Sequence, residues 1–550
     1  MPSSAHSNDP STLAQDPNGA AATLSPNLGE PAREAVRAGS GRSSLSGTVT
    51  SEKNGVPDGM KKDGPKDTDD DAQDDDVIVV GWDGPDDPAN PRNWTLKRKW
   101  TVALTVSSYT FISPIASSMV APAASQIAQA FNIHHSFEGN LTISIFVLAY
   151  AFGPLILGPL SELFGRARVL QAANFFFFVW NLACGFAQNE AELMVFRFLS
   201  GFGGSAPLAC GGAVLSDMWA PEERGQAIAV YSLAPLLGPA IGPVAGGWIA
   251  ERSTWRWVFW STSIAAGLVG ILGILTLPET FAPALLQRKA NKIRKQIDVE
   301  KGPVKEVRTI FQKSGQTKTV KELIVVSLFR PFILFAKEPI IQLVSLYLAF
   351  IYGVIYLVIA TIPPVFANIY HERPGYIGLH YIALGLGLFV ASQINARMLD
   401  RVYVALKKRN NGQGEPEFRL PTVMPGTVLI PIGLLMSGWG AQEHVHWIVP
   451  DIGYAIVGAG MVLIFQGMQT YIIDSFTIYA ASALAAVSFF RSMAGFGFPL
   501  FAPAMFSALG YGKGNTILAA CAFAVGCPAM WLFWTYGKKI RSMSTHARKQ

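Results

Sequence analysis

Charged side chains are rare inside the apolar stretches of this sequence, and two arginines stand out there. Arg197 and Arg491 lie within such stretches, where a charge is unfavourable unless it faces protein or water, and Asp474 lies near the end of another. A group that moves a proton across an apolar barrier must gain and lose charge away from bulk water. Arg197 is therefore a functional candidate, and Asp474 and Arg491 are candidates for proton coupling as a switchable pair. The alternatives are an Arg197 side chain that reaches the membrane surface and a helix-end cap at Asp474.

Aromatic and amide side chains on the apolar stretches are the candidates for substrate contact, because small-molecule sites combine apolar walls with few polar groups. They are Gln342, Tyr347, Tyr352, Tyr356, Gln466 and Gln469. Tyr352 and Tyr356 are four residues apart and share a helix face. A site rich in aromatic rings and poor in acids suits flat, neutral or amphipathic molecules and disfavours polyamines. No phosphate-binding loop or metal-ligand cysteine spacing occurs, so we expect no enzyme activity, no cofactor and no metal.

Twelve apolar stretches must position these side chains. Half of the 550 residues are apolar and 15% are charged, whereas a soluble domain carries about a quarter charged residues. Each stretch is near the ~20 residues that a membrane-spanning helix needs, so we expect an all-α membrane protein with twelve transmembrane helices. The predicted spans are 99–122, 140–160, 168–188, 193–215, 224–250, 256–277, 339–366, 376–396, 421–440, 447–472, 477–503 and 515–537.

Charge distribution predicts the domain organisation and the orientation. A polar segment, 279–338, separates a six-helix half at 99–278 from a second at 339–537. Lys and Arg gather on the side that holds this segment, so the positive-inside rule places both termini in the cytoplasm. The tail at 1–98 is polar and rich in Ser, Gly, Pro and Asp, and we expect it to be disordered. The tail at 538–550 is basic. The net charge of +6 therefore reports orientation and not nucleic-acid binding.

The turn between the second and third spans combines opposite charges with a glycine. Gly165 permits a tight turn, while Glu162, Arg166 and Arg168 lie at the ends of the two helices. A carboxylate in that position can face a helix amino terminus and a guanidinium together, which would latch neighbouring helices reversibly. The alternative is a positively charged anchor with ordinary turn residues.

The fifth span carries a Gly-Pro repeat. Gly238, Gly242 and Gly246 recur every four residues and share one helix face, which allows very close helix packing. Pro239 and Pro243 remove backbone donors and bend the helix, and Gly247 follows. Physical reasoning alone gives a tight packing interface at this position.

These motifs resemble signatures of the major facilitator superfamily. The turn resembles its Gly-x-Leu-Ala-Asp-Arg-x-Gly-Arg-Lys signature, with Glu162 in place of Asp and Leu163 in place of a basic residue. The resemblance implies that Glu162 helps to hold an outward-facing state and that Arg166 pairs with Asp217. The segment around Arg197 resembles the motif of the fourth span that is tied to proton coupling in that family.

The Gly-Pro repeat matches the signature of the antiporter branches, and further matches point to the fungal twelve-span drug:proton antiporters. The further matches are at 81–85, 90–94, 346–353, 416–421, 471–474 and 480–486. The resemblance implies a monomeric plasma-membrane carrier that exports a drug, fungicide or secondary metabolite in exchange for protons. Its partners would be the small molecule, protons and the lipid bilayer. The alternatives are a polyamine or nutrient transporter of the same fold, and a non-transporting receptor on a transporter scaffold.

Overall fold

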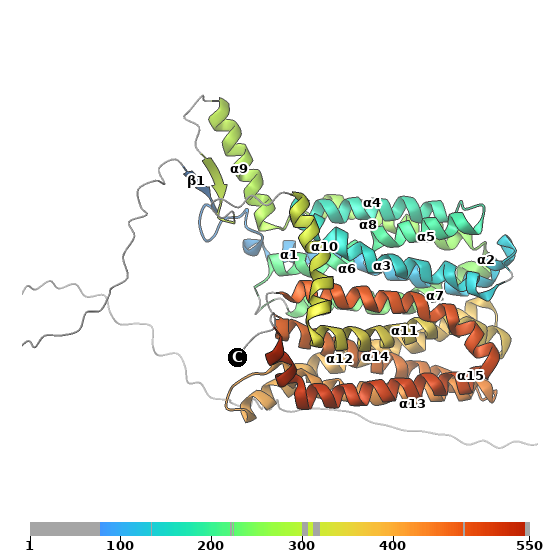
Figure 1. Ribbon diagram of the computed structural model, residues 1–550. Coiled ribbons are helices and arrows are strands. Elements are labelled where there is room, and N and C mark those ends of the chain that lie inside the picture. The colour runs from blue at the N-terminus through green and yellow to red at the C-terminus, as the bar shows by residue number, and fades with distance from the viewer. Residues whose placement is uncertain are drawn as a thin grey trace, which may run out of the picture. The chain divides into compact units, whose positions relative to one another are not determined.

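A computed structural model describes residues 77–133, 135–220, 223, 225–299, 306–311, 320–476 and 479–544. The described chain is dominated by long helices that run side by side (Figure 1). Those that precede residue 280 are α1 (Leu96–Ser118), α2 (Ala124–Phe131), α3 (Ser136–Phe164), α4 (Arg166–Cys184), α5 (Glu190–Gly204), α6 (Ala206–Met218), α7 (Gly225–Arg252) and α8 (Arg256–Thr276). Those that follow residue 338 are α11 (Pro339–Asn368), α12 (Pro374–Arg409), α13 (Met424–Gln442), α14 (Ile448–Phe476) and α15 (Ala480–Met543).

Twelve spans follow from these helices. Within the described ranges, nine helical segments are long and apolar enough to cross a membrane, and α5 and α6 together form one of them. The segment α15 is two helices joined at Gly510, whose φ of 75° breaks the helix. The more polar helices α1 and α4 complete the twelve. The span predicted at 193–215 is interrupted at Ser205, between α5 and α6.

Local sequence explains where the spans begin and end. Pro339 and Pro374 stand in the first turns of α11 and α12, where the missing N–H has no intrahelical partner to lose. The side chain of Asn189 accepts a hydrogen bond from the backbone N–H of Glu192 and caps α5. Gly165 separates α3 from α4 at a φ of 99°, a conformation that favours glycine.

Residues 77–98 do not fit the predicted disordered tail. Strand β1 (Val77–Val80) pairs in parallel with β2 (Glu306–Thr309), and the 3-10 helix η1 (Pro91–Asn93) leads into α1. Val80 and Val307 are buried with Ala290 of α9 (Ala282–Val299), so burial of apolar side chains supports this small sheet. The prediction of disorder is therefore wrong for residues 77–98. The remaining part of the predicted tail, 1–76, lies outside the described residues.

The segment between the two sets of spans contains an apolar helix, α10 (Val320–Lys337), which packs against α3, α11 and α15. Its Phe335 stacks on Phe490 with ring centroids 3.9 Å apart. Phe489 meets both Phe332 of α10, at 5.0 Å, and Phe152 of α3, at 5.7 Å. The second half of the predicted polar segment thus joins the helix packing through aromatic rings (Figure 1).

Candidate functional site

The two ends of the helix bundle are named here by their loops. The basic end carries the turn between α3 and α4, α9 and the last turn of α15, and the opposite end carries α2 (Figure 1). The predicted site residues distribute over both ends and the middle of the spans.

The Gly-Pro repeat of α7 packs on α1 with almost no space between the backbones. A Cβ added at Gly242 would lie 2.7 Å from the Ile115 carbonyl oxygen, and one at Gly238 would lie 2.7 Å from the Cβ of Pro114. A Cβ at Gly246 would overlap the carbonyl oxygen of Met119. Glycine is therefore required on this face because backbone atoms occupy the space of a side chain.

The same helix meets α12 on another face, near the opposite end. A Cβ at Gly378 would lie 2.6 Å from the carbonyl oxygen of Pro243, and one at Gly247 would overlap the carbonyl oxygen of Pro374. A Cβ at Gly385 would lie 2.6 Å from the Cβ of Ala240. The repeat with Pro239 and Pro243 thus places α7 between α1 of its own half and α12 of the other half.

Two residues of the predicted latch, Arg166 and Asp217, form an ion pair at the basic end. The guanidinium Nε of Arg166 donates to the Asp217 carboxylate at 3.4 Å, and its Nη1 donates to Ser161 Oγ at 2.8 Å. Arg166 is buried, while Glu162 and Arg168 are exposed. Glu162 makes no ion pair within the part of the chain that the structure describes. The structure thus brings together Arg166 and Asp217 but leaves Glu162 outside their contact.

Glu279, which the sequence reasoning missed, takes the central position in this latch. Its Oε1 accepts from the backbone N–H of Arg166 at 2.8 Å and of Thr280 at 3.1 Å, and its Oε2 accepts from Arg288 at 3.4 Å. A Cβ at Gly165 would overlap this carboxylate, so the glycine is needed for space as well as for its backbone conformation. The sequence did contain a signal for this residue, because Glu279 is a carboxylate that directly follows the sixth predicted span.

Arg197 is fully buried and ties three helices together. Its Nε donates to the carbonyl oxygen of Thr142 at 3.1 Å, and its Nη2 donates to that of Ile143 at 3.2 Å. Nη1 and Nη2 donate to the carbonyls of Ala116, at 2.9 Å, and Ser117, at 3.2 Å. These last two carbonyls lie in the final turn of α1, where carbonyls lack intrahelical donors and the helix dipole is negative. The alternative of an Arg197 side chain at the membrane surface is therefore wrong.

Arg491 lies against two aromatic rings. Its guanidinium carbon is 4.9 Å from the ring centre of Tyr352 and 4.7 Å from that of Phe465, a cation–π arrangement. Nη2 donates to Ser488 Oγ at 3.4 Å, whereas the buried Nε has no hydrogen-bond partner among the described residues. Asp474 instead accepts from Arg419 at 2.9 Å. The predicted switchable pair of Asp474 and Arg491 is therefore wrong.

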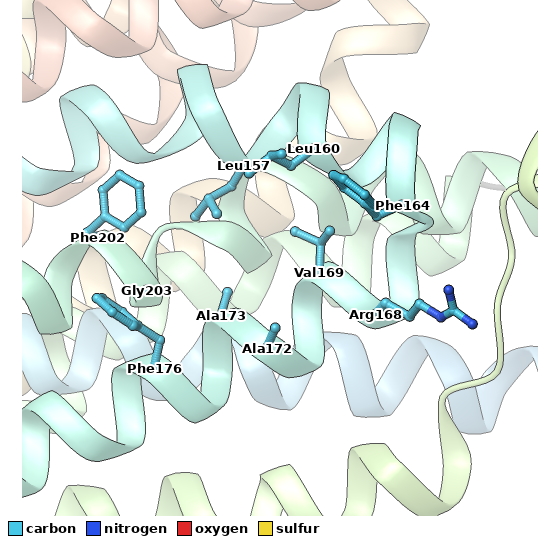
Figure 2. A pocket seen from close by; sticks show the side chains of 10 residues that line it. All are labelled: Leu157, Leu160, Phe164, Arg168, Val169, Ala172, Ala173, Phe176, Phe202 and Gly203. Atoms are coloured by element: carbon cyan, nitrogen blue, oxygen red, sulfur yellow. The ribbon is translucent and has the colours of Figure 1, made fainter. Parts of the chain in front are cut away.

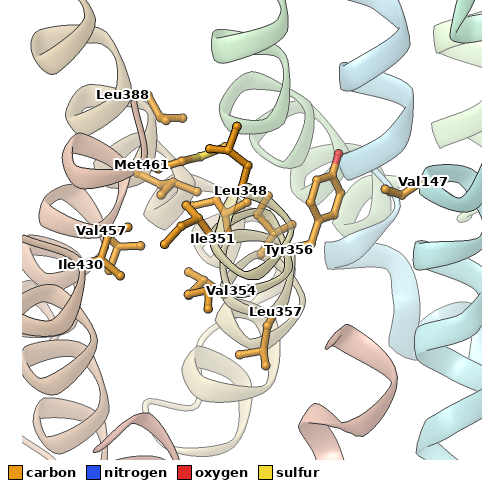
Figure 3. Packing of buried hydrophobic residues seen from close by; sticks show 14 of the residues in the cluster. Val147, Leu348, Ile351, Val354, Tyr356, Leu357, Leu388, Ile430, Val457 and Met461 are labelled. Carbon is orange, nitrogen blue, oxygen red and sulfur yellow. The ribbon is translucent and has the colours of Figure 1, made fainter. Parts of the chain in front are cut away.

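The aromatic clamp, defined as Tyr352, Tyr356, Phe465 and Arg491, lies where the two halves meet. The rings of Tyr352 and Tyr356 are 4.9 Å apart, which agrees with the shared helix face. A Cβ at Gly495 would lie 2.9 Å from the Tyr352 ring and 3.2 Å from Val147 of α3. Figure 3 shows Tyr356 pointing from α11 toward Val147, away from the side of α11 that packs inside its own half. Phe465 is a member that the sequence reasoning missed.

The other substrate candidates stand apart from the aromatic clamp. Gln342 donates to the Ala336 carbonyl at 3.2 Å, at the junction of α10 and α11. Gln466 bridges α14 to α12, donating to Ser392 and accepting from Asn395, each at 2.9 Å. Tyr347 is buried, and a Cβ at Gly526 would lie 3.1 Å from its hydroxyl, so it faces α15 within its half. Gln469 is half-buried on α14.

An apolar groove lies between α3, α4 and α5. Its volume is about 420 Å³, and Leu157, Phe176 and Phe202 line it, with Arg168 at its edge (Figure 2). Apolar side chains on the outer surface of spanning helices face hydrocarbon. The groove contains none of the residues of the aromatic clamp.

A second titratable cluster lies near the opposite end and was also missed. His380 of α12 meets Asp451 of α14 and Glu372 of the preceding loop through its two ring nitrogens. The signal was present in the sequence, because an imidazole and a carboxylate inside predicted spans are both unfavourable without partners.

Comparison with known proteins identifies relatives over most of the chain. The family model described as Major Facilitator Superfamily matches residues 106–499. The chain is 45% identical to the efflux pump vrtL of Penicillium aethiopicum over 87% of its length and 93% of the relative's. It is 40% identical to the efflux pump radE of Floropilus chiversii over 85% of each chain. It is also 45% identical to an uncharacterized transporter of Schizosaccharomyces pombe over 86% of its length and 94% of the relative's.

Solved structures with the same fold include a partially occluded inward-open conformation of the xylose transporter XylE from E. coli. That chain aligns with a TM-score of 0.58 at 15% identity, over 80% of this chain and 98% of XylE. A bacterial homologue of the human lysosomal transporter Spinster, in an inward-facing conformation, aligns with a TM-score of 0.56 at 14% identity, over 82% of this chain and 99% of its own. At these identities the likeness shows the fold, and the predicted all-α fold of this superfamily is confirmed.

Proposed function

Because the chain belongs to the Major Facilitator Superfamily and is a membrane transporter, we propose that it exports small organic molecules in exchange for protons. The observation that carries the export direction is the Gly-Pro repeat, which matches the antiporter signature and packs on both halves. Gly242 of α7 packs on α1, and Gly247 of α7 packs on α12, so α7 is in backbone contact with both halves near the opposite end. Access to that end requires α7 to separate from α12, and a contact without interlocking side chains allows such rocking of two halves.

The names of related proteins support the same direction. Two of the relatives described above are efflux pumps, and each aligns with this chain over at least 85% of both lengths. The Gly-Pro repeat is the antiporter signature of the superfamily, and its two packing faces give that signature a physical role. Nutrient uptake and signalling without transport find no comparable support in the described contacts.

The aromatic clamp supports a flat aromatic substrate. Tyr352, Tyr356 and Phe465 offer ring faces, and the guanidinium of Arg491 has an Nε without a hydrogen-bond partner in the described chain. A buried donor without a partner is unfavourable, so a substrate oxygen that accepts from it would gain a charge-assisted hydrogen bond. The clamp contains no carboxylate, which disfavours polyamines.

The position of the first and last described helices supports the proposed orientation. The start of α1 and the last turn of α15 both lie at the basic end, together with α9 and its Lys and Arg residues (Figure 1). The positive-inside rule places such an end in the cytoplasm. We therefore place a monomer in the plasma membrane with both termini cytoplasmic, and with lipid around the apolar outer faces of the spans.

Flux through purified protein tests this function. The full chain is reconstituted in phosphatidylcholine vesicles, and the movement of fluorescein, a flat aromatic anion, is followed with and without an imposed pH gradient. We expect the flux of the dye to rise several-fold when the pH gradient drives protons in the opposite direction to the dye. Flux that ignores the gradient and a protonophore would indicate a uniporter. Absence of flux for fluorescein and for a panel of aromatic compounds would favour a receptor.

A further inference from the structure

His380 is held between two carboxylates by both nitrogens of its ring. Nδ1 lies 2.8 Å from Oδ2 of Asp451, and Nε2 lies 2.6 Å from Oε2 of Glu372. The side chains of His380 and Asp451 are 7% and 9% exposed, and that of Glu372 is 23% exposed, so the carboxylate of the loop is the wetter one. The ring of Phe366 stacks on the imidazole at a centroid distance of 3.4 Å.

The two contacts determine how many protons the cluster holds. A hydrogen bond needs one proton between its heavy atoms, so the two short contacts of His380 require two protons among the three groups. These are met by an imidazolium between two carboxylates, or by a neutral imidazole with one protonated carboxyl. When one proton leaves, a nitrogen lone pair faces an ionised oxygen across one contact. That contact then becomes repulsive and opens.

Glu372 is the partner that can leave. Asp451 is in α14 and is nearly buried, whereas Glu372 is in the short loop that joins α11 to α12. Asp451 Oδ1 is buried without a hydrogen-bond partner among the described residues, so this carboxylate depends on the proton that it shares with His380. Loss of the outer proton therefore frees the loop and keeps the inner contact.

The loop adjoins the contact between the halves. The N–H of Gly375, three residues after Glu372, donates to Glu251 of α7 at 2.9 Å. Gly378, two residues before His380, is the glycine that packs on the carbonyl of Pro243. A change of charge at His380 thus acts on the first turns of α12, which are the turns that α7 must leave when the opposite end opens.

The groups around the cluster leave no competing partner for the imidazole. From the loops, Tyr370 donates to the carbonyl of Val445 and Trp447 meets the His380 ring edge-on at 5.7 Å. Arg373 is exposed at the start of α12, and Tyr454 of α14 lies against Phe366. Burial raises the pKa of Tyr370, so its hydroxyl stays neutral. Both ring nitrogens face carboxylates, which leaves neither for a metal, and the described residues form no metal-binding group.

We infer that His380, Glu372 and Asp451 form the site that binds the exchanged proton when it enters from the opposite end of the bundle. The inference rests on the proposed proton exchange and names the groups that carry the proton. When the cluster holds both protons, Glu372 stays bound to His380 and the loop is held against α12. When one proton is lost, Glu372 moves away from His380. The site lies near the opposite end, beside the contact that α12 makes with α7.

Hydrogen exchange of the loop tests the site without a substrate. The full chain in phosphatidylcholine vesicles is compared at about pH 5 and about pH 8, a range in which histidine titrates, with the intrinsic exchange rates corrected for pH. We expect the protection of amides at 369–376 to fall about tenfold or more at the higher pH, because a charge-assisted hydrogen bond is lost. Glu372→Gln and His380→Gln should abolish this dependence, and His135→Gln, an exposed histidine at the same end, should retain it.

The outcomes separate this inference from the proposed function. Equal protection of the wild-type loop at both pH values would overturn the proton site, and so would a Glu372→Gln loop that keeps the wild-type fall. In the fluorescein assay, His380→Gln and Glu372→Gln should lose the acceleration of flux by the pH gradient. Acceleration retained by both variants overturns the inference alone. A wild type that shows no acceleration overturns the proposed exchange, while the loop measurement still decides whether the cluster binds the proton.

Discussion

The Glu279 carboxylate accepts a hydrogen bond from the backbone N–H of Arg166 at 2.8 Å, although 113 residues separate the two. This N–H is the first of α4, so Glu279 supplies the cap that Gly165, without a side chain, lacks. Arg166 also reaches Asp217 at the end of α6. One carboxylate and one guanidinium therefore hold the basic ends of α4 and α6 to the turn that follows α8.

Glu279→Ala should destabilise the protein, because it leaves the first N–H groups of α4 and of the turn without a partner. The expected loss is about 1–3 kcal/mol of unfolding free energy, read as a lower melting temperature of the purified protein in detergent. Glu162→Ala is the matched control, since this carboxylate is exposed, and it should change stability by less than about 0.5 kcal/mol. Equal losses for the two variants would assign the latch to both carboxylates.

Hydropathy and glycine spacing predicted the spans and the α7 contact because both signals are local. Each span is a continuous run of apolar residues, and Gly238, Gly242 and Gly246 need only helix periodicity to share a face. The glycine spacing did not show which helix packs against that face. Arg166 and Asp217 were paired only through resemblance, since they are 51 positions apart in the sequence.

The errors arise where partners come from distant parts of the chain. Asp474 was paired with Arg491 by charge, but the rotation of their helices directs Asp474 to Arg419. The positive charge of Arg197 is stabilised by hydrogen bonds to backbone carbonyls. Every residue has a carbonyl, so the residue types in the sequence do not reveal these partners. The cluster of His380 and Asp451 joins two spans whose order along the chain does not show that they are neighbours.

Gly242→Ala should impair transport more than it impairs folding into the membrane. The added methyl would lie 2.7 Å from the Ile115 carbonyl oxygen, so α7 must move away from α1. Overpacking of this kind costs about 1–3 kcal/mol, and we expect at least about a tenfold loss of fluorescein flux at equal protein in the vesicles. Gly212→Ala is the control, because a Cβ at that helical glycine has open space. Normal flux in Gly242→Ala would contradict a role for this close contact.

Arg197→Lys should lower stability and leave the pH response of the remaining transport unchanged. An ammonium group cannot donate in the planar, forked pattern that serves carbonyls of both α1 and α3. Several buried carbonyls then lose donors, and the expected loss is about 2–4 kcal/mol. The control is Arg256→Lys, since Arg256 donates to a single carbonyl, that of Ala187, at 3.0 Å. A stable Arg197→Lys protein that has lost gradient-driven flux would instead support the predicted role of Arg197 in proton coupling.

Arg491→Gln should weaken substrate binding, because it removes the unpartnered charged donor from the aromatic clamp. A hydrogen bond from a charged donor to the substrate is worth about 1.5–3 kcal/mol, which corresponds to a KM for fluorescein raised by about tenfold or more. Arg491→Lys keeps the charge but loses the flat face, so its KM should lie between the two. Arg397→Gln, at an exposed arginine of α12, should match the wild type.

The pH dependence of the Arg491 variants then distinguishes the two roles that a buried arginine can have. If Arg491 binds the substrate, the gradient still accelerates flux at saturating fluorescein, since the proton cluster at His380 is intact. If it carries coupling, as its position in an apolar stretch first suggested, Arg491→Gln keeps the wild-type KM and loses the acceleration. A raised KM with intact acceleration would place substrate recognition at the aromatic clamp and show that Arg491 is not needed for proton coupling.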